Sequence, residues 1–133
     1  MRSGKNSFFF FVVLLFTSCG MGRPELPAAK NKAEELLQYI QAHAYDKTSS
    51  CYSASFNESE NVSKRQEKFE QIEKVSGAVR SINFMESREE IIDERPVLVL
   101  TYKVQHEKTT LTHVLIIGME EGICEVLQHA ISN

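Results

Sequence analysis

Three histidines fall on strands that the C-terminal half of the chain is expected to form: His106, His113 and His129. With a tight turn at Lys108 and Thr109, His113 is expected opposite Val104, with His106 on the same sheet face, and in one register of the next hairpin His129 comes opposite His113. Three imidazoles on one face could bind a metal ion or titrate together. Because His106 lies beside a turn and His129 near the end of its strand, we favour ordinary sheet histidines and expect no metal or other cofactor.

The first eighteen residues have the layout of a signal peptide. Arg2 and Lys5 form a short basic start, and the apolar run FFFFVVLLF covers residues 8–16. These nine residues are too few to span a bilayer, which takes roughly 20 residues as a helix. We therefore expect residues 1–18 to direct export and to be removed.

Cys19 follows this leader and is the candidate lipidation site. The tetrad FTSC, residues 16–19, resembles the lipobox of bacterial lipoproteins, in which the cysteine thiol receives a diacylglyceryl group and cleavage occurs before it. That resemblance implies a membrane anchor at Cys19, with residues 19–27 as a tether to the domain. The alternative is ordinary cleavage after Gly20, because Ser18 and Gly20 also satisfy the small-residue rule.

Cys51 and Cys124 are the cysteines left if Cys19 carries lipid. An exported chain meets an oxidising compartment, where a disulfide would tie the link between the helices to the last strand. Closing so long a loop would contribute roughly 4 kcal/mol by restricting the unfolded chain. The alternative is two separate thiols, with Cys124 buried as a small apolar residue. No pattern assigns a base to either thiol, so we expect no catalysis by them.

Acidic residues gather at the end of the first expected strand and after it: Glu86, Glu89, Glu90, Asp93 and Glu94. Their spacing does not match a calcium-binding EF-hand loop, and Arg88 and Arg95 interrupt the charge. A solvated hairpin is the better interpretation. The 18 acidic and 15 basic residues, with a net charge of −3, argue against a nucleic-acid partner. Catalytic signatures such as HExxH, GxSxG and CxxC are absent from the sequence.

The elements that must position these residues follow from hydrophobic periodicity. A first helix begins at Ala28, with one apolar stripe at spacings of three and four: Ala29, Ala33, Leu36, Leu37, Ile40 and Ala44. Residues 49–61 are polar and predict an irregular link, from which Tyr52 and Phe56 enter the core. The single expected domain covers residues 28–133.

A second helix is expected over residues 64–76. Ser63 and Gln66 fit a capping box, and Gly77 fits the left-handed position that ends many helices. The apolar residues Phe69, Ile72 and Val75 would form its buried face.

Alternating and β-branched residues predict four strands after Gly77, at 78–86, 97–105, 111–119 and 124–132. A charged turn at 88–96 and short turns connect them. Helices followed by strands in meander order give an α+β fold, with the N-terminal helices packed on one face of a curved four-stranded antiparallel sheet.

The order of these elements, and the segment FEQIEKVSG at residues 69–77, resemble small bacterial exported lipoproteins of uncharacterised function. The resemblance covers roughly residues 33–131 and implies a cystatin-like or nuclear-transport-factor-2-like cone, in which a curved sheet wraps a long helix. Such domains often have Trp in the second helix and the last strand, whereas this chain has none. Phe69 and Leu127 are expected at comparable places. The family supplies no established reaction.

We expect a lipid-anchored binding module in the bacterial cell envelope, on the outer membrane and facing the periplasm because no acid follows Cys19. The concave sheet face would receive a small ligand, a peptide or a protein partner. A second hypothesis is a small pocket enzyme of hydrolase or isomerase type, using His113 and a nearby acid. A third is a structural or immunity-type lipoprotein.

Overall fold

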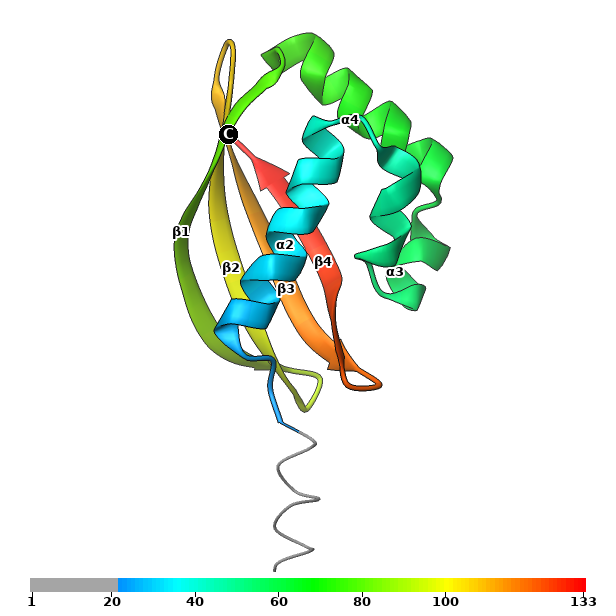
Figure 1. The fold of residues 1–133 in the computed structure, drawn as a ribbon, viewed down its shortest axis with the longest axis vertical. Helices are drawn as coiled ribbons and strands as arrows, with labels where there is room; N and C mark the ends of the chain where they lie inside the picture. Colours follow the sequence, from blue (N-terminus) through cyan, green and yellow to red (C-terminus); the bar gives the residue numbers. More distant parts are fainter. Residues whose placement is uncertain (1–21) are drawn as a thin grey trace, which may run out of the picture.

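The computed structural model describes residues 22–133, so the predicted signal peptide and Cys19 lie outside the described residues. The elements in chain order are α2 (Leu26–Gln41), the 3₁₀-helix η1 (Tyr45–Ser50), α3 (Ala54–Ser59), α4 (Val62–Ser76), β1 (Val79–Ile92), β2 (Arg95–His106), β3 (Thr110–Glu120) and β4 (Ile123–Ser132). Figure 1 shows that the chain enters the domain at its lower end, whereas β4 ends near the top.

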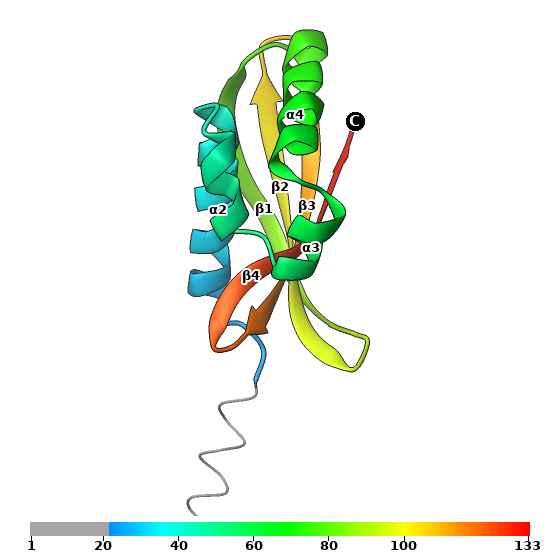
Figure 2. The same ribbon diagram turned by 90° about the vertical axis from the view of Figure 1, so that its right-hand side faces the viewer.

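The strands form one antiparallel sheet in the order β1-β2-β3-β4, which confirms the predicted α+β meander. Helix α2 lies across one face of this sheet (Figure 1). Figure 2, turned by 90°, shows α2 on one side of the sheet and α4 away from α2. Helix α2 contacts all four strands, whereas the main contacts of α4 are with η1.

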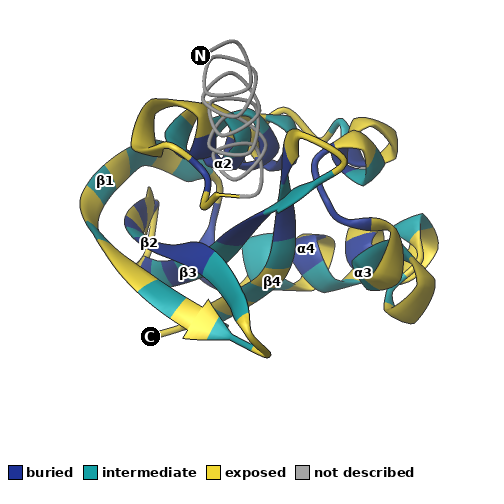
Figure 3. Ribbon diagram, turned by 90° about the horizontal axis from the view of Figure 1, so that it is seen from below, coloured by how far each residue is buried: buried dark blue, intermediate teal, exposed yellow. Residues whose placement is uncertain are grey.

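The core lies between α2 and the central strands. The expected stripe of α2 is buried: Ala29, Ala33, Leu36, Leu37 and Ile40. It faces alternating residues of β2 and β3 that are also buried, namely Leu98, Leu100, Leu115 and Ile117. Figure 3 shows buried residues on α2 and on the strands beneath it, with exposed residues along much of β1. This contact provides most of the apolar core.

The ordered part begins earlier than the sequence predicts. Helix α2 starts at Leu26, two residues before the expected domain boundary, and Pro24 is buried. Arg23 also forms an ion pair with Glu89 of β1 at 2.8 Å. Of the predicted tether, Pro24 is therefore buried in the domain, Arg23 is paired with it, and Leu26 and Pro27 belong to α2.

The segment between the long helices is not an irregular link, because most of it forms η1 and α3. Tyr52 does enter the core, and Phe56 packs against it, as predicted. The capping box is wrong: α4 begins at Val62, and the side-chain oxygen of Asn61 accepts from the Lys64 N–H at 2.9 Å. The helix ends as predicted at Gly77, whose φ is +88°.

The charged segment predicted as a turn is mostly strand. β1 continues to Ile92, and the turn contains only Asp93 and Glu94, both with positive φ. Glu86, Glu89 and Glu90 consequently lie along β1. Within residues 22–133, no group of three His, Cys, Asp or Glu residues is placed to hold a metal ion.

Candidate functional site

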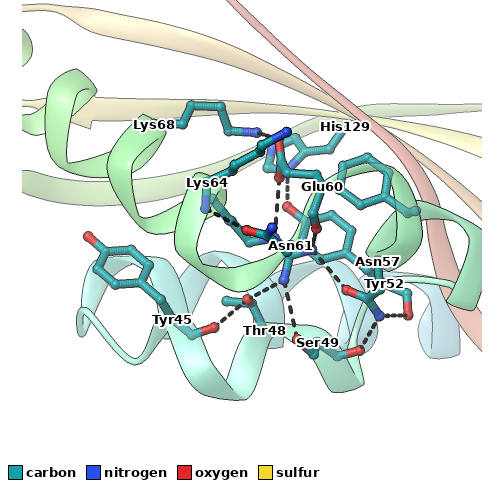
Figure 4. Close-up of polar contacts among 12 residues, drawn as sticks. Tyr45, Thr48, Ser49, Tyr52, Asn57, Glu60, Asn61, Lys64, Lys68 and His129 are labelled. Atoms are coloured by element: carbon teal, nitrogen blue, oxygen red, sulfur yellow. Dashed lines mark hydrogen bonds and ion pairs between the residues drawn. The ribbon is translucent and has the colours of Figure 1, made fainter.

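Arg65, near the start of α4, is completely buried. Its guanidinium lies over the Tyr52 ring, 4.3 Å from the centroid. It donates to Thr48 Oγ1 at 2.9 Å, to Asn57 Oδ1 at 2.8 Å and to the Glu60 carbonyl at 2.9 Å, and its Nε donates to the Glu60 carboxylate at 3.2 Å. Figure 4 labels these three partners. A buried charge is tolerable when it is paired and hydrogen-bonded in this way.

This cluster joins α4 to the two short helices before it. Lys68, one turn after Arg65, forms a second ion pair with the Glu60 carboxylate at 2.8 Å. The Tyr52 ring stacks on Phe56 at a centroid distance of 4.2 Å. The η1 and α3 segments are thus held by polar bonds and stacking, with little apolar core of their own.

A hydrogen-bonded chain runs from this cluster into the sheet. The Tyr52 hydroxyl lies 2.7 Å from His129 Nδ1, and His129 Nε2 lies 2.8 Å from His113 Nδ1. If the Tyr52 proton is donated to His129, then His129 Nε2–H donates to His113, and the proton of His113 is on its Nε2. We infer this direction because it uses the Tyr52 proton.

Burial keeps both imidazoles neutral. It lowers the pKa of His113 to about 4, with a smaller effect from the nearby His106. The pKa of His129 is also lowered well below its usual value, first by burial and then by His113. Burial raises the pKa of the Tyr52 hydroxyl, which therefore keeps its proton. The chain is neutral at pH 7.

The three predicted histidines do share one sheet face, but only two of them bond to each other. The predicted register is wrong: His113 pairs across from Tyr102, and His129 from Leu115. His106 bonds separately, from Nδ1 to the Gly77 carbonyl at 2.6 Å. No metal site arises from them in the described part of the chain.

His113 Nε2 has no hydrogen-bond partner among residues 22–133. It belongs to the wall of an internal cavity of about 20 Å³, whose other lining residues are Leu37, Ile40, Phe69, Ile72, Val79, Val104 and His106. A volume of that size holds about one water molecule. The wall of this cavity has no carboxylate, and the cavity is too small for a substrate.

An open groove lies between α4 and the C-terminal half of β4. Its volume is about 450 Å³, and its lining residues are Lys68, Gln71, Ile72, Val75, Ser76, Leu111, His129, Ile131, Ser132 and Asn133. The Val75 side chain, predicted to be core, is 65% exposed, so that prediction is wrong. Ile72 is only partly buried. His129 is the point at which the buried hydrogen-bonded chain meets the groove.

A larger hollow of about 610 Å³ lies at the opposite end, between the first half of α2 and the β3–β4 turn. Its charged groups are partly paired, since Lys32 lies 3.6 Å from the Glu35 carboxylate. That carboxylate also accepts from the Cys51 thiol. The hollow also has an exposed apolar side chain, Ile123 (57%), but its lining carries four charged residues, Arg23, Glu25, Lys32 and Glu35. The lining of the groove beside β4 carries one, Lys68, so we regard the groove as the better candidate site.

The two cysteines of the domain are separate thiols, so the disulfide prediction does not match this structure. Cys51 Sγ donates to Glu35 at 3.2 Å, and Cys124 Sγ lies 3.5 Å from the Met119 sulfur. Burial, followed by the Glu35 carboxylate, raises the pKa of Cys51 to about 12. A thiol with that pKa is not a nucleophile at neutral pH.

Sequence reasoning missed Arg65 and the Tyr52–His129 bond. A signal for Arg65 exists, because it precedes the buried Phe69 by four residues and so lies on the same helix face. No comparable signal exists for the Tyr52–His129 bond, which joins residues 77 positions apart.

The chain matches no known protein-family model and no curated protein sequence. Among the described residues, none of the helices has the length and apolar character needed to cross a membrane.

Proposed function

We propose that this protein is a lipid-anchored binding module of the cell envelope, which receives a partner in the groove between α4 and β4 and performs no catalysis. One observation carries the proposal. The groove leaves Val75 65% exposed on a helix whose other central apolar residues turn inward. An exposed apolar side chain in a concave site is typical of a binding surface.

The position of the groove fits an anchor on Cys19. The described chain begins at the lower end of the domain in Figure 1, whereas α4 and the end of β4 lie near the top. A lipid on Cys19, three residues before Gly22, would hold the groove on the side away from the membrane. In an outer-membrane lipoprotein facing the periplasm, soluble and membrane-bound partners would both reach it.

The pocket-enzyme hypothesis has less support. It requires His113 beside a carboxylate in a cavity that admits a substrate. His113 instead bonds to His129, and its cavity of about 20 Å³ has no acidic residue in its wall. The resemblance to cystatin-like or nuclear-transport-factor-2-like cones stays a prediction about the shape of the sheet.

The anchor is tested by mass spectrometry of the mature N-terminus, with and without globomycin, which blocks lipoprotein signal peptidase. We expect a chain that begins at diacylated Cys19, and accumulation of the lipidated precursor when globomycin is present. A Cys19→Ala variant is the control. An unmodified chain beginning at Met21 would contradict the anchor.

Binding at the groove is tested by a photo-crosslinking amino acid placed at Val75 in living cells. Met85 of β1, which is 55% exposed, is the matched control position. We expect discrete adducts from position 75 and none from position 85. Equal adduct patterns from both positions, or none from either, would contradict a binding role for the groove.

A further inference from the structure

The pairing of β4 determines which of its backbone groups point away from the sheet. Glu121 and Gly122 form a two-residue turn with φ values of +52° and +79°, as in a type I′ hairpin. Counting from that turn, Val126 forms a non-hydrogen-bonded pair with Ile117. Its N–H and C=O therefore point outward.

The chain itself already uses these outward groups. The Val126 N–H donates to the Cys51 carbonyl, and the Val126 carbonyl accepts from the Ser53 N–H, both at 2.9 Å. Tyr52 thus forms a short parallel bridge on the edge of β4. This bridge covers only that position, because the chain then turns into α3.

The rest of the β4 edge is open. Leu127 is an extra residue in β4, so after it the odd-numbered residues have the outward backbone orientation that Val126 has before it. His129 then lies opposite Leu115, and Ile131 opposite His113. The N–H and C=O groups of His129 and Ile131 point outward, and no residue between 22 and 133 bonds to them from outside the sheet. The α4 backbone stands apart from β4 along this stretch, where the groove lies.

We infer that an extended peptide segment of a partner protein binds here, by adding as a strand to β4 at His129 and Ile131. Outward donors and acceptors that alternate with the spacing of a β-strand are matched only by another extended backbone. Side chains alternate across an added strand, so every second one faces α4. The inference rests on the proposed function and names its partner class.

The groove also indicates the side chains of that peptide. Its inner wall carries the apolar side chains of Ile72, Val75, Leu111 and Ile131. Val75 is the exposed one, and its contact with a branched apolar residue would remove both from water. The peptide is therefore an alternating one, with apolar residues toward α4 and polar residues toward solvent.

A single strand fits this position better than a second copy of the chain. Two copies paired through β4 edges would bring both α4 helices to the same face of the joined sheet. The groove lies between α4 and β4, so the second α4 would need the same space. The occupant is therefore a peptide segment and not another copy.

The test uses the mature lipidated protein in nanodiscs and a displayed library of random eight-residue peptides. Selected peptides are measured against wild type, Ile131→Pro and Ile131→Val. Proline removes the outward N–H without breaking a bond to β3, so the fold is retained, and valine keeps the N–H. We expect alternating apolar peptides that bind wild type and Ile131→Val alike and Ile131→Pro about tenfold more weakly.

Hydrogen exchange locates the bound peptide. We expect the amides of His129 and Ile131 to exchange more slowly with peptide present, and the amide of Ala130, which faces β3, to be unchanged. Failure to select peptides, equal binding by Ile131→Pro, or protection elsewhere would overturn strand addition. A wild-type dimer in light scattering that becomes monomeric with Ile131→Pro would also overturn it, in favour of a second copy.

The crosslinking assay separates this inference from the proposed function. If Ile131→Pro leaves the yield of adducts at position 75 unchanged, strand addition is wrong and the binding function stands. If position 75 gives no adducts in wild type, the proposed function fails as well.

Discussion

The two long helices are held in place by different kinds of contact. Helix α2 buries an apolar stripe against the sheet, beginning at Ala29 and ending at Ile40. Helix α4 buries only Arg65, Phe69 and Ser76, and it is held at its start by a charged, hydrogen-bonded cluster. Helix α2 is therefore held by buried apolar surface, and α4 mainly by hydrogen bonds and ion pairs.

This difference explains where an open site can occur. An apolar stripe must be covered along its whole length, because every uncovered side chain stays in water. The bonds of Arg65 fix the start of α4. Its second end is held by the β2–β3 turn, where the Lys108 N–H donates to the Ser76 carbonyl at 2.9 Å and His106 bonds to the Gly77 carbonyl, and it stands away from β4. The groove lies at that second end, around Val75. The comparison predicts that losses near Arg65 and along α2 affect stability, whereas changes at Val75 do not.

The largest effect is expected for Arg65→Met. It removes the cation while the acceptors of Thr48, Asn57 and Glu60 stay buried or partly buried. We expect a loss of about 3–5 kcal/mol in the free energy of unfolding, measured by urea denaturation. Lys64→Met is the control, since Lys64 is exposed on the same turn. A loss no larger than that of the control would show that the cluster does not hold α4.

Leu36→Ala tests the other helix. Leu36 is fully buried at the centre of the α2 stripe. We expect a loss of about 3 kcal/mol in the free energy of unfolding, from lost transfer energy and the cavity left behind. The same urea titration measures it. An effect below about 1 kcal/mol would mean that the sheet collapses onto the space and that α2 contributes less than its burial indicates.

Acid should lower the free energy of unfolding of the domain, because His113 is buried in its neutral form. His113 has a folded-state pKa of about 4, lowered from an ordinary value of 6.5, and it lies near His106, His129 and Lys68. The unfolded chain therefore binds protons from about pH 6.5 downward, whereas the folded domain does not until about pH 4. Stability is complete above pH 6.5 and falls between these values, by about 3 kcal/mol for His113.

Urea titrations at pH 7 and pH 4 measure this dependence, with His113→Asn as the comparison. The variant side chain carries no titratable group, so its stability should fall less over that interval. Carboxylates contribute to both proteins, and the difference between the two slopes reports His113 together with its effect on the pKa of His129. Parallel slopes would contradict a buried neutral imidazole.

The smallest effect is expected for Val75→Ala. Because its side chain is 65% exposed, the free energy of unfolding should change by less than about 0.5 kcal/mol. Thermal unfolding measures it against Leu36→Ala. A loss near that of Leu36→Ala would place Val75 in the core and remove the groove from consideration.

Local pattern was enough for the elements with a strong apolar period. The stripe of α2, the strands around Leu98 and Leu115, and the helix end at Gly77 follow from spacing that each segment carries by itself. It was not enough for η1 and α3, because their positions depend on bonds to Arg65 that a polar local sequence does not reveal. The prediction of Val75 as core failed for a related reason, since periodicity cannot say whether a partner surface is present.

The sequence by itself determined the order of the two long helices and the four strands, and the burial of α2, because these depend on the periods of 3.6 and 2 residues. Only the tertiary structure decided that His129 bonds to both Tyr52 and His113, that Arg65 is buried, and that the edge of β4 is open. Those outcomes depend on register and on contacts between distant segments. Such contacts form only when the whole chain packs.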